Sequence, residues 1–82
     1  EDTTARILKL EEYLRDGDSA RISAEGHTIK GASYALGATL LGDEAKVLEF
    51  SGKANNLQEA MQHMPRLKQA FELTKKAMQV YL

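Results

Sequence analysis

The sequence predicts an all-α fold, an antiparallel four-helix bundle. Apolar residues recur at intervals of three and four along four successive segments, which is the period of an amphipathic helix. Short polar stretches containing glycine, aspartate or asparagine separate the segments, so consecutive helices are expected to run antiparallel. No β-branched run alternates apolar and polar residues as a half-buried strand would.

The first helix is predicted to follow possible N-caps at residues 2–4. Its apolar face comprises Ile7, Leu10 and Leu14, with Leu8 and Tyr13 at the edges. The stretch 16–19 ends this helix, and Asp18 or Ser19 within it supplies the N-cap of the next one.

The second helix is predicted to run to about Leu36, because Gly37 can adopt the left-handed conformation that ends a helix. Thr39 caps or begins the third helix, whose end is weakened by residues 51–52 and 55–56. The predicted apolar face of this third helix is formed by Leu40, Leu41, Ala45, Leu48 and Ala54.

The last segment has the most regular apolar stripe, which continues through the only proline of the chain. The stripe consists of Leu57, Met61, Met64, Leu67, Phe71, Thr74, Met78 and Tyr81, and its methionines are expected to fill gaps in the core. Pro65 removes the backbone hydrogen bond to the Met61 carbonyl and should kink the helix, or else it begins a separate helix after a break near His63. We favour one kinked helix.

Length and composition restrict the possible classes of function. The chain of 82 residues is expected to form one domain over residues 1–82. With no cysteine it has no disulfide or thiolate zinc site, and with a net charge of −1 it lacks the basic surface of a nucleic-acid binder. Because no apolar run approaches the roughly 18 residues of a membrane span, we expect a cytoplasmic protein without membrane contact.

A histidine surrounded by small residues lies in the second predicted helix. Gly31 follows His27 by four positions, whereas Ser23 and Ala24 precede it by four and three. Helical side chains lean toward the N-terminus, so the residue at position 31 is the one that would lie back against His27. His27 is therefore expected on an uncrowded surface that the active site of another protein could cover.

Lys30 is the one long side chain expected beside His27. An ammonium group next to an imidazole disfavours the imidazolium form and would stabilise an anionic group arriving at the ring. This pair is what a phosphoryl acceptor requires. Tyr34, one turn further along, either borders the docking surface or packs against the third helix.

These residues resemble the core pattern of the histidine-containing phosphotransfer domains of two-component signalling. In this pattern a histidine is followed, after two residues, by lysine and glycine, then by small residues, an apolar residue and another glycine. The matching residues are His27, Lys30, Gly31, Ala32, Ser33, Leu36 and Gly37. The resemblance implies that Nε2 of His27 accepts a phosphoryl group from the aspartyl phosphate of a receiver domain. It further implies that His27 passes this group to the aspartate of another receiver.

The same resemblance singles out Glu49. Members of the family place a glutamine or glutamate twenty-two positions after the histidine, where it bonds the other ring nitrogen. A carboxylate that accepts a hydrogen bond from Nδ1–H would leave the Nε2 lone pair free and support the positive charge that grows on the ring during attack. Glutamate is also the residue found in the phosphorylated domain of chemotaxis-type kinases, where the donor is ATP held by a separate kinase domain.

The expected partners are receiver domains of response regulators, a sensor histidine kinase, or both. The chain has no glycine-rich nucleotide loop and no carboxylates spaced for magnesium, so we expect it to bind no cofactor and its receiver partner to supply Mg²⁺. Weak docking of a monomer is expected over the first two helices, with Ala24, Gly31 and Tyr34 near the centre and Leu14 at the edge.

Two other functions are weighed beside the phosphorelay carrier. The chain could be the phosphorylated segment of a chemotaxis-type kinase, which keeps the chemistry of His27 and changes the donor. It could also be a helical adaptor that binds through the same face without transfer.

Gly26 and Gly42 are expected only to permit close helix contacts, and His63 is expected to be solvated or to pack.

Overall fold

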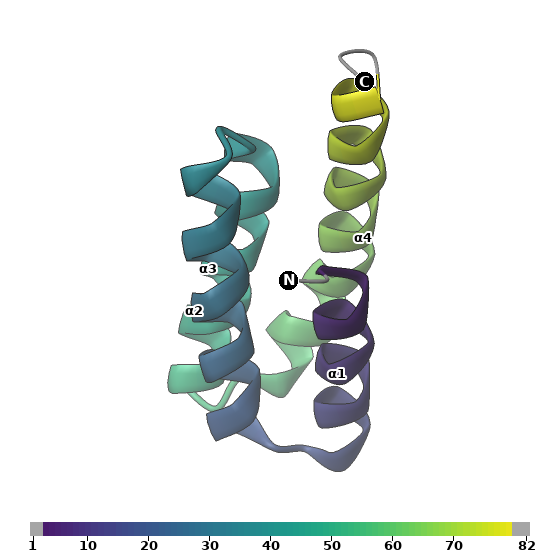
Figure 1. Cartoon of the computed structure of the whole chain (residues 1–82). Coiled ribbons are helices and arrows are strands. Elements are labelled where there is room, and N and C mark those ends of the chain that lie inside the picture. Colours follow the sequence, from purple (N-terminus) through teal and green to yellow (C-terminus); the bar gives the residue numbers. More distant parts are fainter. Residues whose placement is uncertain (1–2, 80–82) are drawn as a thin grey trace.

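The computed structural model describes residues 3–79 and consists there of four helices without a strand. The helices are α1 (Thr3–Asp16), α2 (Ser19–Ala35), α3 (Thr39–Lys53) and α4 (Leu57–Gln79). Figure 1 shows α2 and α3 as an antiparallel pair and α1 lying along one half of the longer α4. The predicted all-α four-helix fold is thereby confirmed.

The three turns each contain one residue with positive φ. These residues are Gly17 at 69°, Gly37 at 77° and Asn55 at 55°. The left-handed end predicted at Gly37 is confirmed. Asp18 rather than its neighbour caps α2, because its Oδ1 accepts a hydrogen bond from the backbone N of Arg21 at 3.2 Å.

The hydrophobic core takes residues from all four helices. Its members are Ile7, Leu10, Ile22, Ile29, Leu41, Ala45, Leu48, Ala60, Met64, Leu67 and Ala70. Burying a large apolar side chain contributes about 1.5–3 kcal/mol, so this cluster supplies most of the stability of a chain that has no cysteine for a disulfide.

Two methionines and one leucine predicted for the core are exposed instead. Met61, Met78 and Leu40 all lie on the surface. Met64 and Leu67 are buried as predicted, but Ala60 and Ala70 are buried one residue before Met61 and Phe71, while Leu57 and Phe71 are partly buried against the core. One residue rotates a side chain by about 100° around a helix, which moves Met61 out of the core.

The ends of the other predicted apolar stripes also differ. Ala54 is the C-cap of α3 and is exposed, so it does not extend the buried face of that helix. Tyr81 lies outside the described residues. Helix α4 continues through Pro65, so the alternative of two separate helices is wrong, while the bend at Pro65 stays a prediction.

Helices α2 and α3 approach each other so closely that glycine is required on both. A Cβ atom added to Gly26 would lie 2.8 Å from the backbone N of Glu49, and one added to Gly52 would lie 2.6 Å from the backbone N of Ser23. The role predicted for Gly26 as a close helix contact is confirmed. Gly52, which the sequence indicated only as a weak helix end, has the same role.

Candidate functional site

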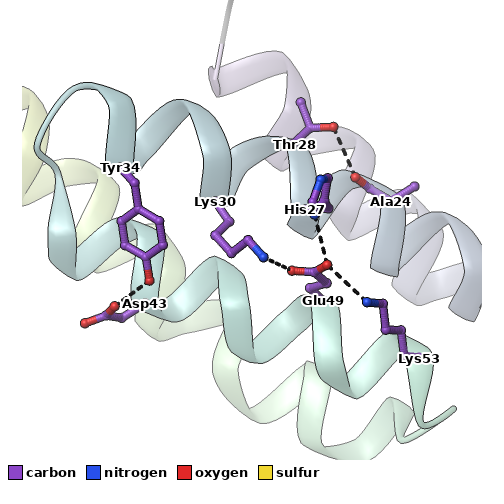
Figure 2. Close-up of polar contacts among 8 residues, drawn as sticks. All are labelled: Ala24, His27, Thr28, Lys30, Tyr34, Asp43, Glu49 and Lys53. Atoms are coloured by element: carbon purple, nitrogen blue, oxygen red, sulfur yellow. Dashed lines mark hydrogen bonds and ion pairs between the residues drawn. The ribbon is translucent and has the colours of Figure 1, made fainter.

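His27 lies on the side of α2 that faces α3. Its side chain is 68% exposed, and its ring lies above Glu49 of α3 in Figure 2. Nδ1 of the ring is 3.0 Å from Oε2 of Glu49. With the proton on Nδ1, the ring donates to this carboxylate and Nε2 keeps its lone pair.

Glu49 is buried directly under this ring. The residue is 3% exposed, and it projects from α3 at the point where the backbone of α3 touches Gly26. The glycine contact brings the two helices close enough for a short glutamate side chain to reach the ring. The geometry of the histidine and glutamate pair is therefore determined by backbone packing.

Two lysines neutralise the buried carboxylate. Nζ of Lys30 is 2.7 Å from Oε1 of Glu49, and Nζ of Lys53 is 3.4 Å from Oε2. Together they lower the pKa of Glu49 from 4.5 to about 2: the bond to Lys30 is the largest cause, burial opposes it, and His27 and Lys53 also lower it. Glu49 is thus ionised at neutral pH, and with two ammonium groups the cluster has one net positive charge.

The position of Lys30 adds to what the sequence predicted. The sequence placed its ammonium beside the imidazole, whereas the structure pairs this ammonium with Glu49, and the lysine side chain is largely buried. Its observed contact is therefore with the carboxylate that holds His27.

The surface beyond His27 is open at Gly31. A Cβ atom added there would have no atom within 4 Å, and Ala24 is also exposed. The hydroxyl of Thr28 donates to the carbonyl of Ala24 at 3.1 Å and so stays against its own helix. The residues of α2 on this side of the ring, Ala24 and Gly31, are therefore small and open to solvent.

A family model described as the Hpt domain matches residues 1–77. The chain belongs to the Hpt domain family. Membership assigns it a phosphotransfer role in two-component signalling and interaction with receiver domains or kinases. Searches of curated proteins and of solved structures found no match.

Two further residues predicted at the docking surface of this Hpt domain are partly buried, and their part in docking stays a prediction. Ser23 is half-buried with its backbone against Gly52, on the same side of α2 as His27 four residues later. Leu14 packs against the core on the same face of α1 as Ile7 and Leu10, and it lines a groove between α1 and α4. The spacing of four and seven residues from these core positions explains why Leu14 packs against the core.

Tyr34 of the Hpt domain packs across onto α3 and stays partly exposed. Its hydroxyl donates to Oδ1 of Asp43 at 2.6 Å, and its ring lies against Gly42, which leaves no room for a Cβ atom. The bond to Asp43 is the main cause that raises the pKa of Tyr34 above 10.0. The close contact expected at Gly42 is confirmed, with a ring rather than a backbone as the neighbour.

Lys53 and Phe50 lie near the site without having been expected there from the sequence. Lys53 follows Glu49 by four positions, a spacing that brings opposite charges together on a helix and could have identified it. Phe50 has no such signal, because a lone aromatic residue in an amphipathic helix is usually assigned to the core. In the structure it is half-exposed.

His63 forms a second pair of histidine and glutamate away from the site. Its Nδ1 is 3.0 Å from Oε1 of Glu44, and both side chains are mostly buried between α3 and α4. Of the two roles expected for His63, solvated or packed, the structure shows the packed one. Within residues 3–79 there is no group of three potential metal ligands, and no helix there is long and apolar enough to cross a membrane.

Proposed function

We propose that this Hpt domain carries a phosphoryl group on Nε2 of His27, received from a receiver aspartyl phosphate and passed to the aspartate of another receiver. One observation supports this most: Nδ1 contacts a buried carboxylate while the rest of the ring is exposed. The ring is held by one nitrogen and can react through the other.

In the transfer step, the Nε2 lone pair attacks phosphorus and forms a P–N bond. The P–O bond to the donor aspartate breaks, and its electron pair stays on the released carboxylate. The imidazole ring gains a positive charge and keeps its proton on Nδ1. Oε2 of Glu49 accepts a hydrogen bond from this proton at 3.0 Å, so the charge develops next to an ionised carboxylate.

Lys30 acts mainly through Glu49. By binding Oε1 it keeps the carboxylate ionised and fixed, with Oε2 turned toward His27. The net positive charge of the cluster also stabilises the dianionic phosphoryl group as it reaches the ring. The receiver supplies the reacting aspartate and, we propose, the Mg²⁺ that neutralises the phosphoryl oxygens.

Open space at Gly31 and the exposed Ala24 admit the receiver to the ring. A larger side chain at position 31 would stand on the α2 surface that the receiver must approach. Transfer between proteins needs in-line positioning more than added chemistry, so this access is part of the function.

The test is transfer of label from phosphorylated receiver domains in the presence of Mg²⁺. We expect acid-labile, base-stable label on the wild-type domain and none on His27→Gln, with helical circular dichroism retained. His63→Gln is the matched control, because His63 also has a carboxylate 3.0 Å from Nδ1. Label retained on His27→Gln and lost from His63→Gln would refute the assignment.

The two other functions give different results in the same experiment. If only an ATP-dependent kinase domain labels His27, the chain is the phosphorylated segment of a chemotaxis-type kinase. If receivers bind without label and no kinase labels the chain, it is an adaptor.

A further inference from the structure

Helix α3 carries a phenylalanine on its outer surface, directly after Glu49. Phe50 is 50% exposed. Two ammonium groups stand near its ring: Nζ of Lys46 is 5.8 Å and Nζ of Lys53 is 5.7 Å from the ring centre. We call Phe50, Lys46 and Lys53 the aromatic–lysine patch.

This patch is continuous with the site around His27. The ammonium of Lys53 belongs to both, because it also lies 3.4 Å from Oε2 of Glu49, the oxygen that contacts Nδ1 of His27. In Figure 2, Lys53 and the His27 ring converge on the same end of the Glu49 carboxylate. A protein that covers His27 from the α3 side therefore meets Phe50 and its lysines.

The charges on this face favour an acidic partner. Glu49 is buried and paired with two lysines, and the exposed Asp43 accepts the hydroxyl of Tyr34. Asp43 stays an exposed negative charge beside Tyr34, whereas the exposed charge of α3 that reaches the Glu49 cluster is the ammonium of Lys53, and Lys46 adds a second cation at Phe50. An aromatic anchor between cations fits an apolar depression bordered by carboxylates.

We propose that the aromatic–lysine patch recognises the receiver domain: Phe50 enters an apolar depression beside the phosphorylated aspartate, and Lys46 and Lys53 face carboxylates around it. The inference rests on the proposed function, which requires a receiver to reach Nε2. It places part of the recognition surface on α3, beyond the first two helices that the sequence indicated.

The exposed leucines between α3 and α4 lack this link to the site. Leu73, on α4, is exposed to a similar degree and lines a groove with Leu40 between α3 and α4. Neither residue contacts the cluster around Glu49. Leu73 therefore serves as the matched control for Phe50.

The test compares Phe50→Ala with Leu73→Ala in transfer from a phosphorylated receiver at increasing receiver concentration. Labelling by phosphoramidate is measured in parallel; Nε2 attacks its phosphorus, the P–N bond breaks and ammonia leaves. For Phe50→Ala we expect the half-saturating receiver concentration to rise roughly tenfold, whereas Leu73→Ala matches the wild type. Rates at low receiver concentration are normalised to phosphoramidate labelling, which separates docking from the reactivity of His27.

A charge reversal tests the lysines independently. Lys46 leaves the Glu49 cluster intact, since within residues 3–79 the groups paired with that carboxylate are Lys30, Lys53 and His27. Lys46→Glu is expected to raise the half-saturating receiver concentration at low salt and to weaken its dependence on salt. A merely structural role of the lysine would alter thermal unfolding without this change in salt dependence.

The outcomes separate the inference from the proposed function. If receivers label the wild type while Phe50→Ala and Leu73→Ala behave alike, the proposed function stands and the recognition role of the patch is wrong. If phosphoramidate labels His27 but no receiver does, a receiver is not the phosphoryl donor. The proposed function and the recognition role of the patch are then both wrong. An effect of Phe50→Ala confined to labelling by a kinase would also overturn the inference.

Discussion

Replacing Gly26 by alanine should displace the backbone that carries Glu49. The added Cβ would lie 2.8 Å from the backbone N of Glu49 and 3.0 Å from the carbonyl O of Ala45. Both neighbours are backbone atoms, so no flexible side chain can move aside. Ordinary contact begins at 3.4 Å, and 3.4 minus 2.8 means that α3 must retreat by about 0.6 Å.

The same retreat acts on stability and on the site. Overpacking of this kind costs about 2 kcal/mol, and the higher helix propensity of alanine offsets up to about 1 kcal/mol, which leaves a net loss of about 1 kcal/mol. Glu49 would move with the backbone, and its bond to Nδ1 of His27, now 3.0 Å, would stretch toward the limit of a hydrogen bond. Phosphorylation should therefore slow as well.

Gly31→Ala is the matched control, because it makes the same change five residues later in the same helix, in open space. It should stabilise the domain by up to about 1 kcal/mol, so the two variants should differ by about 2 kcal/mol in urea unfolding followed by circular dichroism. For Gly26→Ala alone, a net loss of about 1 kcal/mol lowers Tm by roughly 4–8 °C. Equal stability of the two variants would refute the inference that α2 and α3 touch at Gly26.

Three further predictions concern the charged cluster. The pKa of Glu49 is held at about 2 instead of 4.5, so its carboxylate stabilises the fold fully above pH 4.5, by about 3 kcal/mol, and this contribution is lost as the pH falls toward 2. Glu49→Gln should therefore flatten the pH dependence of urea unfolding in this range, and an unchanged slope would contradict the pairing. Glu49→Ala should reduce the population of the Nδ1–H tautomer of His27, measured by ¹⁵N chemical shifts, and slow phosphorylation; wild-type shifts would remove the orienting role. Lys30→Ala should slow transfer and raise the pKa of Glu49, and wild-type behaviour in both would exclude Lys30 from the mechanism.

Local signals in the sequence were sufficient for the helices and turns. Gly37 ends α2 with positive φ and Asp18 caps the same helix, as their residue types indicate. Choosing the buried face of α4 was harder, because methionine and alanine fit either of two adjacent stripes. Contact with the other helices decides that Ala60 is buried and Met61 exposed, and a periodicity within one helix does not contain this information.

In the candidate site, too, features set within one helix could be predicted from the sequence, whereas features set by packing between helices could not. The small residues around His27 could be placed from helix geometry, and the spacing of Glu49 came from a family resemblance. That Lys30 binds the carboxylate depends on how far α3 stands from α2, which is set by Gly26 and Gly52 together. Such a distance arises only when two helices pack, and neither segment alone predicts it.

The glycine contacts between α2 and α3 have a consequence for the speed of exchange between partners. Because backbone touches backbone at Gly26 and Gly52, the ring and its supporting carboxylate are preorganised before any partner arrives. Docking then costs little conformational entropy at the reacting atoms. A small contact surface can suffice for productive encounter, and a small surface also separates quickly, as a carrier that serves two proteins in turn requires.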